Sequence, residues 1–293
     1  MTRVRKALLA ALLVAVTGTA LLLGPGERVA ASAIVDAPNR GMPEPAPIPG
    51  EIRIPTRGAT IAVELVEPSS ADGPPLATVF VLHGIRDRRE SMRGLGHMLA
   101  AHRLRAVLVD LRGHGRSTGD HLTYGVFDRD DLATVASTLA AEGRVAEPFA
   151  AFGFSYGAAT AIQWSASDPR LRAVVAVAPF ASLRAIVPEY TPLPLPARYV
   201  DSCVDRAGRE AGFDPDRASP EHAVTTTATP LLLVHGDADE RIPIAHSRRI
   251  AAAAGGHAEL VVVHGATHES VFAAPEIADR AIPWLEESVT RAR

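Results

Sequence analysis

The chain has 293 residues, a length that allows one large α/β domain or two smaller ones. Hydrophobic residues make up 47% of the chain and charged residues 22%, which excludes disorder over most of its length, and the net charge of −3 offers no general attraction to nucleic acid. The single cysteine, Cys203, excludes an intrachain disulfide, a zinc ribbon and a CxxC redox site.

The first 33 residues have the order of a secretory signal peptide. Three cations within the first six residues precede an uncharged apolar run, Ala7–Gly24, and the small residues Ala31-Ser32-Ala33 follow. We therefore expect residues 1–33 to direct export to the cell envelope or beyond and to be cleaved near Ala33. If the leader is not cleaved, the apolar run becomes an anchor, and this is the one membrane contact that we expect.

Residues 34–55 are predicted to be an extended linker. Prolines recur through this range and restrict the backbone to extended conformations (Pro38, Pro43, Pro45, Pro47, Pro49 and Pro55).

From Ile52 onward, short apolar runs alternate with helical patterns, which predicts a mainly parallel sheet with helices on both faces. A hairpin across Arg57-Gly58 is expected to add antiparallel strands at one edge (Ile52–Ile54 and Thr60–Val66). Six nearly continuous apolar runs are expected to be buried strands (Ala77–Leu82, Ala106–Val109, Phe149–Phe152, Ala173–Val177, Leu231–Val234 and Leu260–Val263).

Two helices and one insertion are predicted between these strands. Asp128 can cap a helix that continues to about Ala141, and a second helix runs from Gly157 to about Ser167. Residues 186–229 interrupt the alternation with several prolines and a polar stretch. We expect them to form a small cap over one end of the sheet.

Two segments match the pattern Gly-x-Ser-x-Gly. Gly153–Gly157 directly follows an apolar strand and opens an Ala-rich helix, the context in which this pattern exposes a nucleophilic serine on a sharp turn. Gly115–Gly119 lies several residues beyond a strand and precedes Asp120 and His121. Ser155 is therefore the predicted nucleophile, and Ser117 is predicted to be a loop residue.

A serine nucleophile needs a base and a group that orients the base. His268 follows the last predicted strand in a polar loop, at the end of the sheet where ligands bind, and is preferred to His264 at the strand terminus. Asp239 and Asp237 both follow the strand that ends at Val234. Asp239 is preferred as the orienting acid because Asp237 is better placed to form a turn.

Two backbone amides are predicted to bind the oxyanion that forms when a serine attacks a carbonyl. One is the N–H of Tyr156, which directly follows the nucleophile. The other is the N–H of Ile85, because Gly84 allows the chain to bend after the preceding strand.

Together these motifs resemble the α/β-hydrolase superfamily over about Ile52 to Val289, and most closely the branch of serine aminopeptidases and monoacylglycerol-lipase-like esterases. The resemblance rests on motifs in the same order: His83-Gly84, Asp110–Ser117, Gly153–Gly157, His235–Asp239 and His268. Many relatives have a further glycine where this chain has Ala158. The resemblance implies an α/β-hydrolase domain over residues 56–293 and a structural role for Asp110–Ser117.

The sequence therefore predicts an exported serine hydrolase that cleaves a small-molecule carboxylic ester through an acyl-serine intermediate. An acyltransferase or an amidase or peptidase would use the same three side chains, and a non-catalytic binding protein could retain the fold. No cofactor, metal or nucleic-acid partner is expected, because no Gly-rich phosphate motif follows a strand and no HExxH is present. The residues do not define an oligomeric state.

Overall fold

The computed structural model describes residues 26–191 and 195–291. In these residues one eight-stranded sheet has the spatial order β1-β2-β4-β3-β5-β6-β7-β8, and pairing is antiparallel at β1–β2–β4 and parallel elsewhere. The strands are β1 (Glu51–Thr56), β2 (Ala59–Val66), β3 (Ala77–Leu82), β4 (Leu104–Val109), β5 (Phe149–Phe154), β6 (Leu171–Val177), β7 (Leu231–Gly236) and β8 (Ala258–Val263). The predicted fold class is confirmed.

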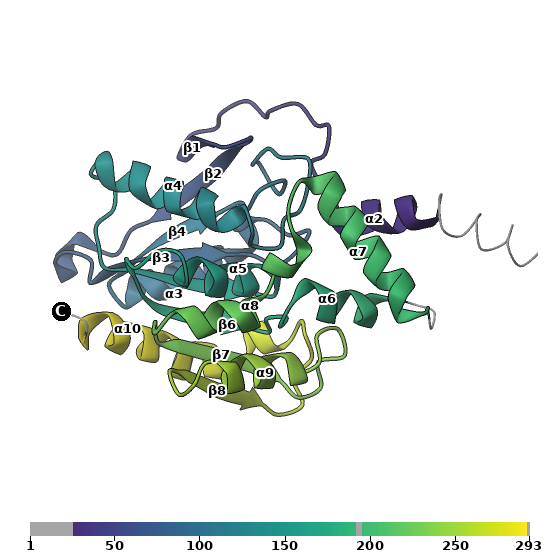
Figure 1. Ribbon diagram of the computed structural model, residues 1–293. Helices are drawn as coiled ribbons and strands as arrows, with labels where there is room; N and C mark the ends of the chain where they lie inside the picture. Colours follow the sequence, from purple (N-terminus) through teal and green to yellow (C-terminus); the bar gives the residue numbers. More distant parts are fainter. Residues whose placement is uncertain (1–25, 192–194, 292–293) are drawn as a thin grey trace, which may run out of the picture.

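Helices cover both faces of this sheet (Figure 1). They are α2 (Glu27–Val35), α3 (Arg93–Ala101), α4 (Asp128–Ala141), α5 (Tyr156–Ser165), α6 (Leu183–Ile186), α7 (Ala197–Ala211), α8 (Pro220–Ala223), α9 (Ala245–Ala253) and α10 (Ile282–Arg291). Short 3-10 turns join them, at η2 (Ser70–Asp72), η3 (Arg89–Met92), η4 (Val187–Tyr190), η5 (Pro215–Arg217), η6 (Val224–Thr226) and η7 (Val271–Ala273), and η8 (Ile277–Ala281) is a π-helical turn before α10.

The sheet separates two apolar layers. In β3, Phe80 and Leu82 belong to the layer that contains α4 and α5, while Val79 and Val81 belong to the layer that contains α3 and α10. Successive side chains of a strand point to opposite faces, so a strand buried on both faces is apolar at every position. This is why the central strands were predictable as continuous apolar runs.

The N-terminal region contains regular structure where a linker was predicted. The apolar run Ala7–Gly24 lies outside the described residues, but the expected cleavage point near Ala33 lies inside α2. The predicted linker, residues 34–55, contains the end of α2 and most of β1. Only its proline-rich middle, residues 37–50, lacks helix and strand. The residues that follow this middle pair with β2.

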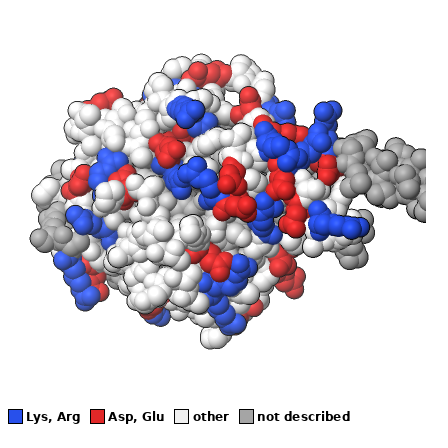
Figure 2. Space-filling model, in the orientation of Figure 1, with Lys and Arg blue, Asp and Glu red and all other residues white. Residues whose placement is uncertain are grey.

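The predicted cap region contains helices. The chain between β6 and β7 forms α6, α7 and α8, and α7 lies beside α2 in Figure 1. Figure 2 shows positive and negative side chains interspersed on the face that includes α7, with neither sign dominating. In the described part of the chain no helix has the length and apolar character needed to cross a membrane.

Candidate active site

Ser155 lies at a sharp turn between β5 and α5. Its backbone has φ 52° and ψ −111°, a conformation that residues other than glycine rarely adopt. Such strain persists only where the surrounding structure enforces it, and it is concentrated at functional sites.

The glycines on either side of Ser155 allow this turn through close approach of the backbone. A Cβ at Gly153 would lie 2.4 Å from the carbonyl oxygen of Gly157, and a Cβ at Gly157 would lie 2.4 Å from the carbonyl oxygen of Leu82. The Gly157 N–H also donates to the carbonyl of His83 at 3.1 Å. The turn is therefore held against the end of β3.

The structure brings Ser155, His268 and Asp239 into one hydrogen-bonded chain. His268 Nε2 lies 3.1 Å from Ser155 Oγ, and His268 Nδ1 lies 2.7 Å from Asp239 Oδ2. The three residues follow β5, β8 and β7, whose carboxyl ends share one edge of the sheet. An ionised carboxylate only accepts hydrogen bonds, so Nδ1 carries the proton and Nε2 is free to accept one from Ser155.

Asp239 is held as an anion. Burial alone would raise the pKa of this carboxyl, but hydrogen bonds from His235 and His268 outweigh it and hold the pKa well below its usual range. The backbone N–H groups of Arg241 and Ile242 also donate to its Oδ1, at 2.9 and 2.8 Å. Every strong contact of the carboxylate is thus with a donor, which favours the charged form.

His264 and Asp237, the alternatives to His268 and Asp239, pair with each other and not with this chain of hydrogen bonds. His264 Nδ1 lies 2.8 Å from Asp237 Oδ2, and the imidazole of His264 is 87% exposed. Asp237 also accepts from the Gly265 N–H at 2.7 Å, as expected of a turn-forming residue. Ser117 donates its hydroxyl to the carbonyl of Asp110 and does not contact His268.

The two predicted oxyanion donors adjoin Ser155. Tyr156 begins α5, so its N–H has no partner within the helix. Ile85 follows Gly84, where a Cβ would lie 3.6 Å from the Cβ of Ser155, so this loop passes close to the serine. In the part of the chain that the structure describes, no acceptor is found for the Ile85 N–H.

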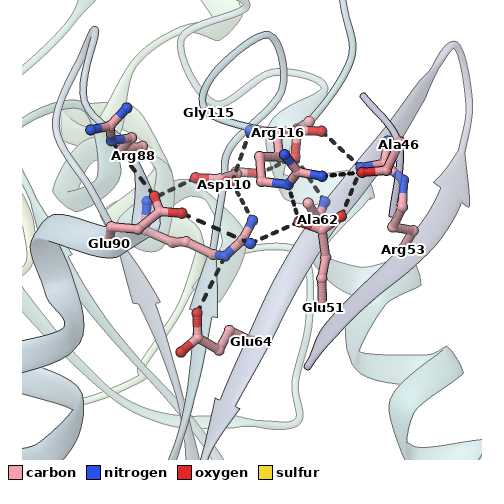
Figure 3. Close-up of polar contacts among 12 residues, drawn as sticks. Ala46, Glu51, Arg53, Ala62, Glu64, Arg88, Glu90, Asp110, Gly115 and Arg116 are labelled. Atoms are coloured by element: carbon pink, nitrogen blue, oxygen red, sulfur yellow. Dashed lines mark hydrogen bonds and ion pairs between the residues drawn. The ribbon is translucent and has the colours of Figure 1, made fainter. Parts of the chain in front are cut away.

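Buried ion pairs hold Arg89, at the end of the loop that contains Ile85, and Figure 3 shows Asp110 and Glu51, the two carboxylates of these pairs. Asp110 accepts from the backbone N–H groups of Arg89 and Arg116, at 2.8 and 2.9 Å, and it pairs with the Arg89 guanidinium. Arg89 also pairs with Glu51 of β1 at 2.8 Å. Burial raises the pKa of Glu51, but hydrogen bonds from Arg116 and Arg89 lower it further than burial raises it. A buried charge is costly without its partner, so these pairs hold the loop in place.

Sequence reasoning missed two features of the site. His235 Nε2 donates to the Ile242 carbonyl at 2.7 Å and lies 3.3 Å from Asp239 Oδ2, so a second histidine adjoins the acid. A pocket of about 660 Å³ opens at Ser155 and includes Ala30, Ala33 and Ile34 of α2. His235 directly follows the predicted strand Leu231–Val234, which was a usable signal for the first feature, whereas no local signal joined α2 to the site. No set of three or more possible metal ligands is found in residues 26–191 and 195–291.

Comparison with protein families identifies two matching segments. The family described as serine aminopeptidase, S33, matches residues 73–219, which is half of the chain. A second family, described as TAP-like protein, matches residues 198–283.

Among curated proteins, the chain is similar to the monoacylglycerol lipase of Mycolicibacterium smegmatis, with 28% identity over 253 residues that cover 73% of this chain and 89% of the lipase. It is also 24% identical over 209 residues to the uncharacterized protein YfhR of Escherichia coli K12, covering 69% of this chain and 68% of that protein.

Among solved structures, the Pyrococcus furiosus esterase Pf2001 matches with a TM-score of 0.65 and 19% identity, over 82% of this chain and 92% of the esterase. Est1E of Butyrivibrio proteoclasticus, solved with ferulic acid, matches with a TM-score of 0.62 and 18% identity, over 82% of this chain and 99% of Est1E. At these identities the likeness shows the fold. With a family match across half of the sequence on that fold, the resemblance expected from the motifs is confirmed: the chain belongs to the α/β-hydrolase superfamily, in the family described as serine aminopeptidase, S33.

Proposed function

We propose that the protein is a serine hydrolase that cleaves carboxylic esters through an acyl-serine intermediate. The observation that supports this most strongly is the hydrogen-bonded chain Asp239–His268–Ser155 at a strained turn that opens into a pocket. All three side chains are at least nine-tenths buried, so their geometry is held by packing. Nucleophile, base and orienting acid are the groups that such chemistry requires.

In the first half of the proposed reaction, Ser155 Oγ attacks the ester carbonyl carbon while His268 Nε2 takes the hydroxyl proton. Asp239 holds the imidazole in the required tautomer and stabilises the imidazolium. The N–H groups of Ile85 and Tyr156 bind the negative oxygen. The carbon–oxygen bond to the alcohol then breaks, and the imidazolium returns the proton to the leaving oxygen.

In the second half, water replaces the alcohol. His268 takes a proton from the water as it attacks the acyl carbon, a second tetrahedral intermediate forms in the same oxyanion hole, and its collapse releases the acid and restores the Ser155 hydroxyl. An alcohol in place of water would give transfer by the same steps, and added alcohol distinguishes these outcomes by product analysis.

The charges around the pocket favour an ester over a peptide with a free amino terminus. The described lining residues include two cations, Arg86 and Arg241, and no aspartate or glutamate. Arg241 pairs with Glu269, which lies outside the lining, at 2.8 Å. A protonated amino group would therefore meet no carboxylate among the described lining residues. One solved relative is an esterase by name and one curated relative is a monoacylglycerol lipase, which agrees with this choice.

The leader remains part of the proposal, since three cations precede an apolar run at the N-terminus. We propose that the leader takes the hydrolase out of the cytoplasm, with Ala7–Gly24 as its apolar segment.

The test uses a fluorophosphonate probe on the full chain, followed by peptide mass analysis, together with hydrolysis of p-nitrophenyl butyrate and of the matched p-nitroanilide. We expect the label on Ser155, rapid release from the ester and much slower release from the anilide. A folded protein that neither takes the label nor hydrolyses the ester contradicts the proposal. Faster cleavage of the anilide would instead assign an amidase.

A further inference from the structure

The pocket at Ser155 is mainly apolar and reaches as far as the N-terminal helix. Its volume, about 660 Å³, lies within the usual range for small-molecule sites, about 300–1,000 Å³. Its lining includes Ser155 and Tyr156, part of the chain between β6 and β7, and Ala30, Ala33 and Ile34 of α2. The pocket therefore joins the nucleophile to a segment that precedes the domain expected from the sequence.

The residues of α2 divide between the core and the pocket. Ala31 and Val35, four residues apart on one face, are fully buried in the main apolar core. Ala30, Ala33 and Ile34 line the pocket. Two of these three side chains are single methyl groups, so their size leaves space that a larger residue would occupy.

Hydrogen bonds fix the end of α2 to the body of the domain. The Leu122 N–H donates to the carbonyl of Val35 at 2.7 Å, and the Tyr124 hydroxyl donates to the carbonyl of Ile34 at 2.6 Å. Tyr124 lines the same pocket, and its ring centroid lies 5.5 Å from that of Tyr156. The wall made by α2 is thus joined to the nucleophile turn through one buried aromatic contact.

The helix is also held on its other side. A Cβ at Gly26 would lie 2.9 Å from the Tyr199 hydroxyl of α7, and Glu27 lies 4.0 Å from Arg206 of α7. Figure 1 shows α2 and α7 adjacent at the edge of the molecule. Because α2 packs on the core and beside α7, it is an integral helix of the domain and forms part of the pocket wall.

We propose that α2 is a wall of the acyl pocket and that Ala30 and Ala33 determine how long an acyl chain the enzyme accepts; this inference rests on the proposed ester hydrolysis. The acyl group stays bound to Ser155 through both halves of that reaction, whereas the alcohol leaves after the first. The apolar pocket is therefore assigned to the acyl chain, and the substrate class is an ester with an apolar acyl chain.

Cleavage after Ala33 would remove Ala30, Ala31 and Ala33, and with them part of the core contact and the pocket wall. The active enzyme must therefore keep Glu27–Val35, so any processing occurs before Glu27.

The test measures kcat/KM of the full chain on p-nitrophenyl esters from acetate to decanoate. Ala30→Trp and Ala33→Trp are expected to lower the decanoate-to-acetate ratio at least tenfold, because each methylene excluded from the pocket costs about fourfold in kcat/KM, from about 0.8 kcal/mol of burial. Val29→Trp is the matched control, since Val29 lies on the same helix but is 71% exposed and does not line the pocket. It is expected to keep the parent ratio.

Ile34→Ala gives a second measurement that does not depend on fitting a larger side chain. Its smaller side chain should enlarge the pocket and shift the preferred acyl length upward. Chain-length profiles that match the parent in both tryptophan variants and in Ile34→Ala overturn the inference, as does an active exported protein whose N-terminus begins after Ala33. If the parent hydrolyses no ester at all, the proposed function fails instead, and the acetate reaction of the parent separates these two results.

Discussion

Two segments of this chain share the pattern Gly-x-Ser-x-Gly and fold into different structures. In residues 153–157 the serine itself takes the positive φ, and the glycines supply space for backbone contacts. In residues 115–119 the glycines take positive φ, at 51° and 132°, and the serine has ordinary geometry. The same sequence pattern thus has its positive φ at the serine in one segment and at the glycines in the other.

The flanking elements explain this difference. Gly153 lies within β5, and Tyr156 begins α5, so the chain must reverse within the residues of the pattern. Ser117 has a loop on both sides, and its hydroxyl is occupied: it donates to the carbonyl of Asp110 at 2.6 Å and accepts from the Ala62 N–H at 2.8 Å. A buried hydroxyl that already donates one hydrogen bond and accepts another has a structural role. The comparison shows that the strand before the pattern and the helix after it carry the functional information.

Replacing each serine by alanine is the sharpest way to test this comparison. Ser155→Ala is expected to lower kcat on p-nitrophenyl butyrate by about 10⁴- to 10⁶-fold, because the nucleophile is lost while the oxyanion donors remain. Ser117→Ala should keep the parent kcat per folded molecule. Steady-state kinetics on both variants measures this, and a large loss of kcat in Ser117→Ala with normal turnover in Ser155→Ala would reverse the assignment.

Unfolding in urea is the control for these two variants. Ser117→Ala should lose about 3 kcal/mol of unfolding free energy, because two buried backbone partners lose their hydrogen bonds and each unpaired group costs about 1 to 3 kcal/mol. Ser155→Ala should stay close to the parent, since its backbone strain is unchanged. Equal stability of both variants would show that the hydrogen bonds of Ser117 contribute little.

A second pair, Asp239 and Asp237, extends the comparison to the loop after β7. Asp239→Asn is expected to lower kcat by about 10⁴-fold, because an amide does not fix the His268 tautomer or stabilise the imidazolium. Asp237→Asn should change kcat by no more than about twofold, since its partners are an exposed histidine and a turn amide. Circular dichroism checks that both variants fold, and similar kcat losses in the two would show that the loop and not the acid matters.

Much of the fold and of the candidate site could be predicted because both depend on local patterns. The central strands are apolar at every position since the sheet is covered on both faces. The helix predicted to start at Asp128 and to continue to about Ala141 is α4, although Asp128 is its first residue and not its N-cap. The carboxyl ends of parallel strands share one edge, so residues that follow different strands could be expected to meet there. Ser155 and His268 meet in this way across 113 positions of sequence.

The remaining features depend on contacts that have no local pattern. The small residues at positions 30–33 fit a signal-peptidase cleavage site and a closely packed helix equally well. The nine residues of α2 are too few to show a clear helical periodicity of apolar residues. The partner helix, α7, begins at residue 197. The burial of the charged residues Glu51, Arg89 and Asp110 could not be predicted for the same reason. A charged side chain is normally exposed unless a partner compensates it, and here the partners are distant in the sequence.

The smallest expected effect concerns His114, in the loop beside Ser117. His114 is fully buried, and burial, with a further contribution from nearby His83, lowers its pKa to about 4. Between pH 6.5 and 4 the unfolded chain therefore takes up a proton that the folded protein does not. The resulting stability is complete above about pH 6.5 and is lost as the pH falls, with about 2 kcal/mol gone at pH 5.

His114→Asn keeps an amide that can donate to the Arg112 carbonyl in place of Nδ1. Its unfolding free energy should fall less than that of the parent between pH 7 and pH 5, by about 2 kcal/mol, when both are measured by urea denaturation. An equal fall in both proteins would show that His114 is protonated in the folded state, and the loop around Ser117 would then not be the closely packed structural segment that distinguishes it from the turn at Ser155.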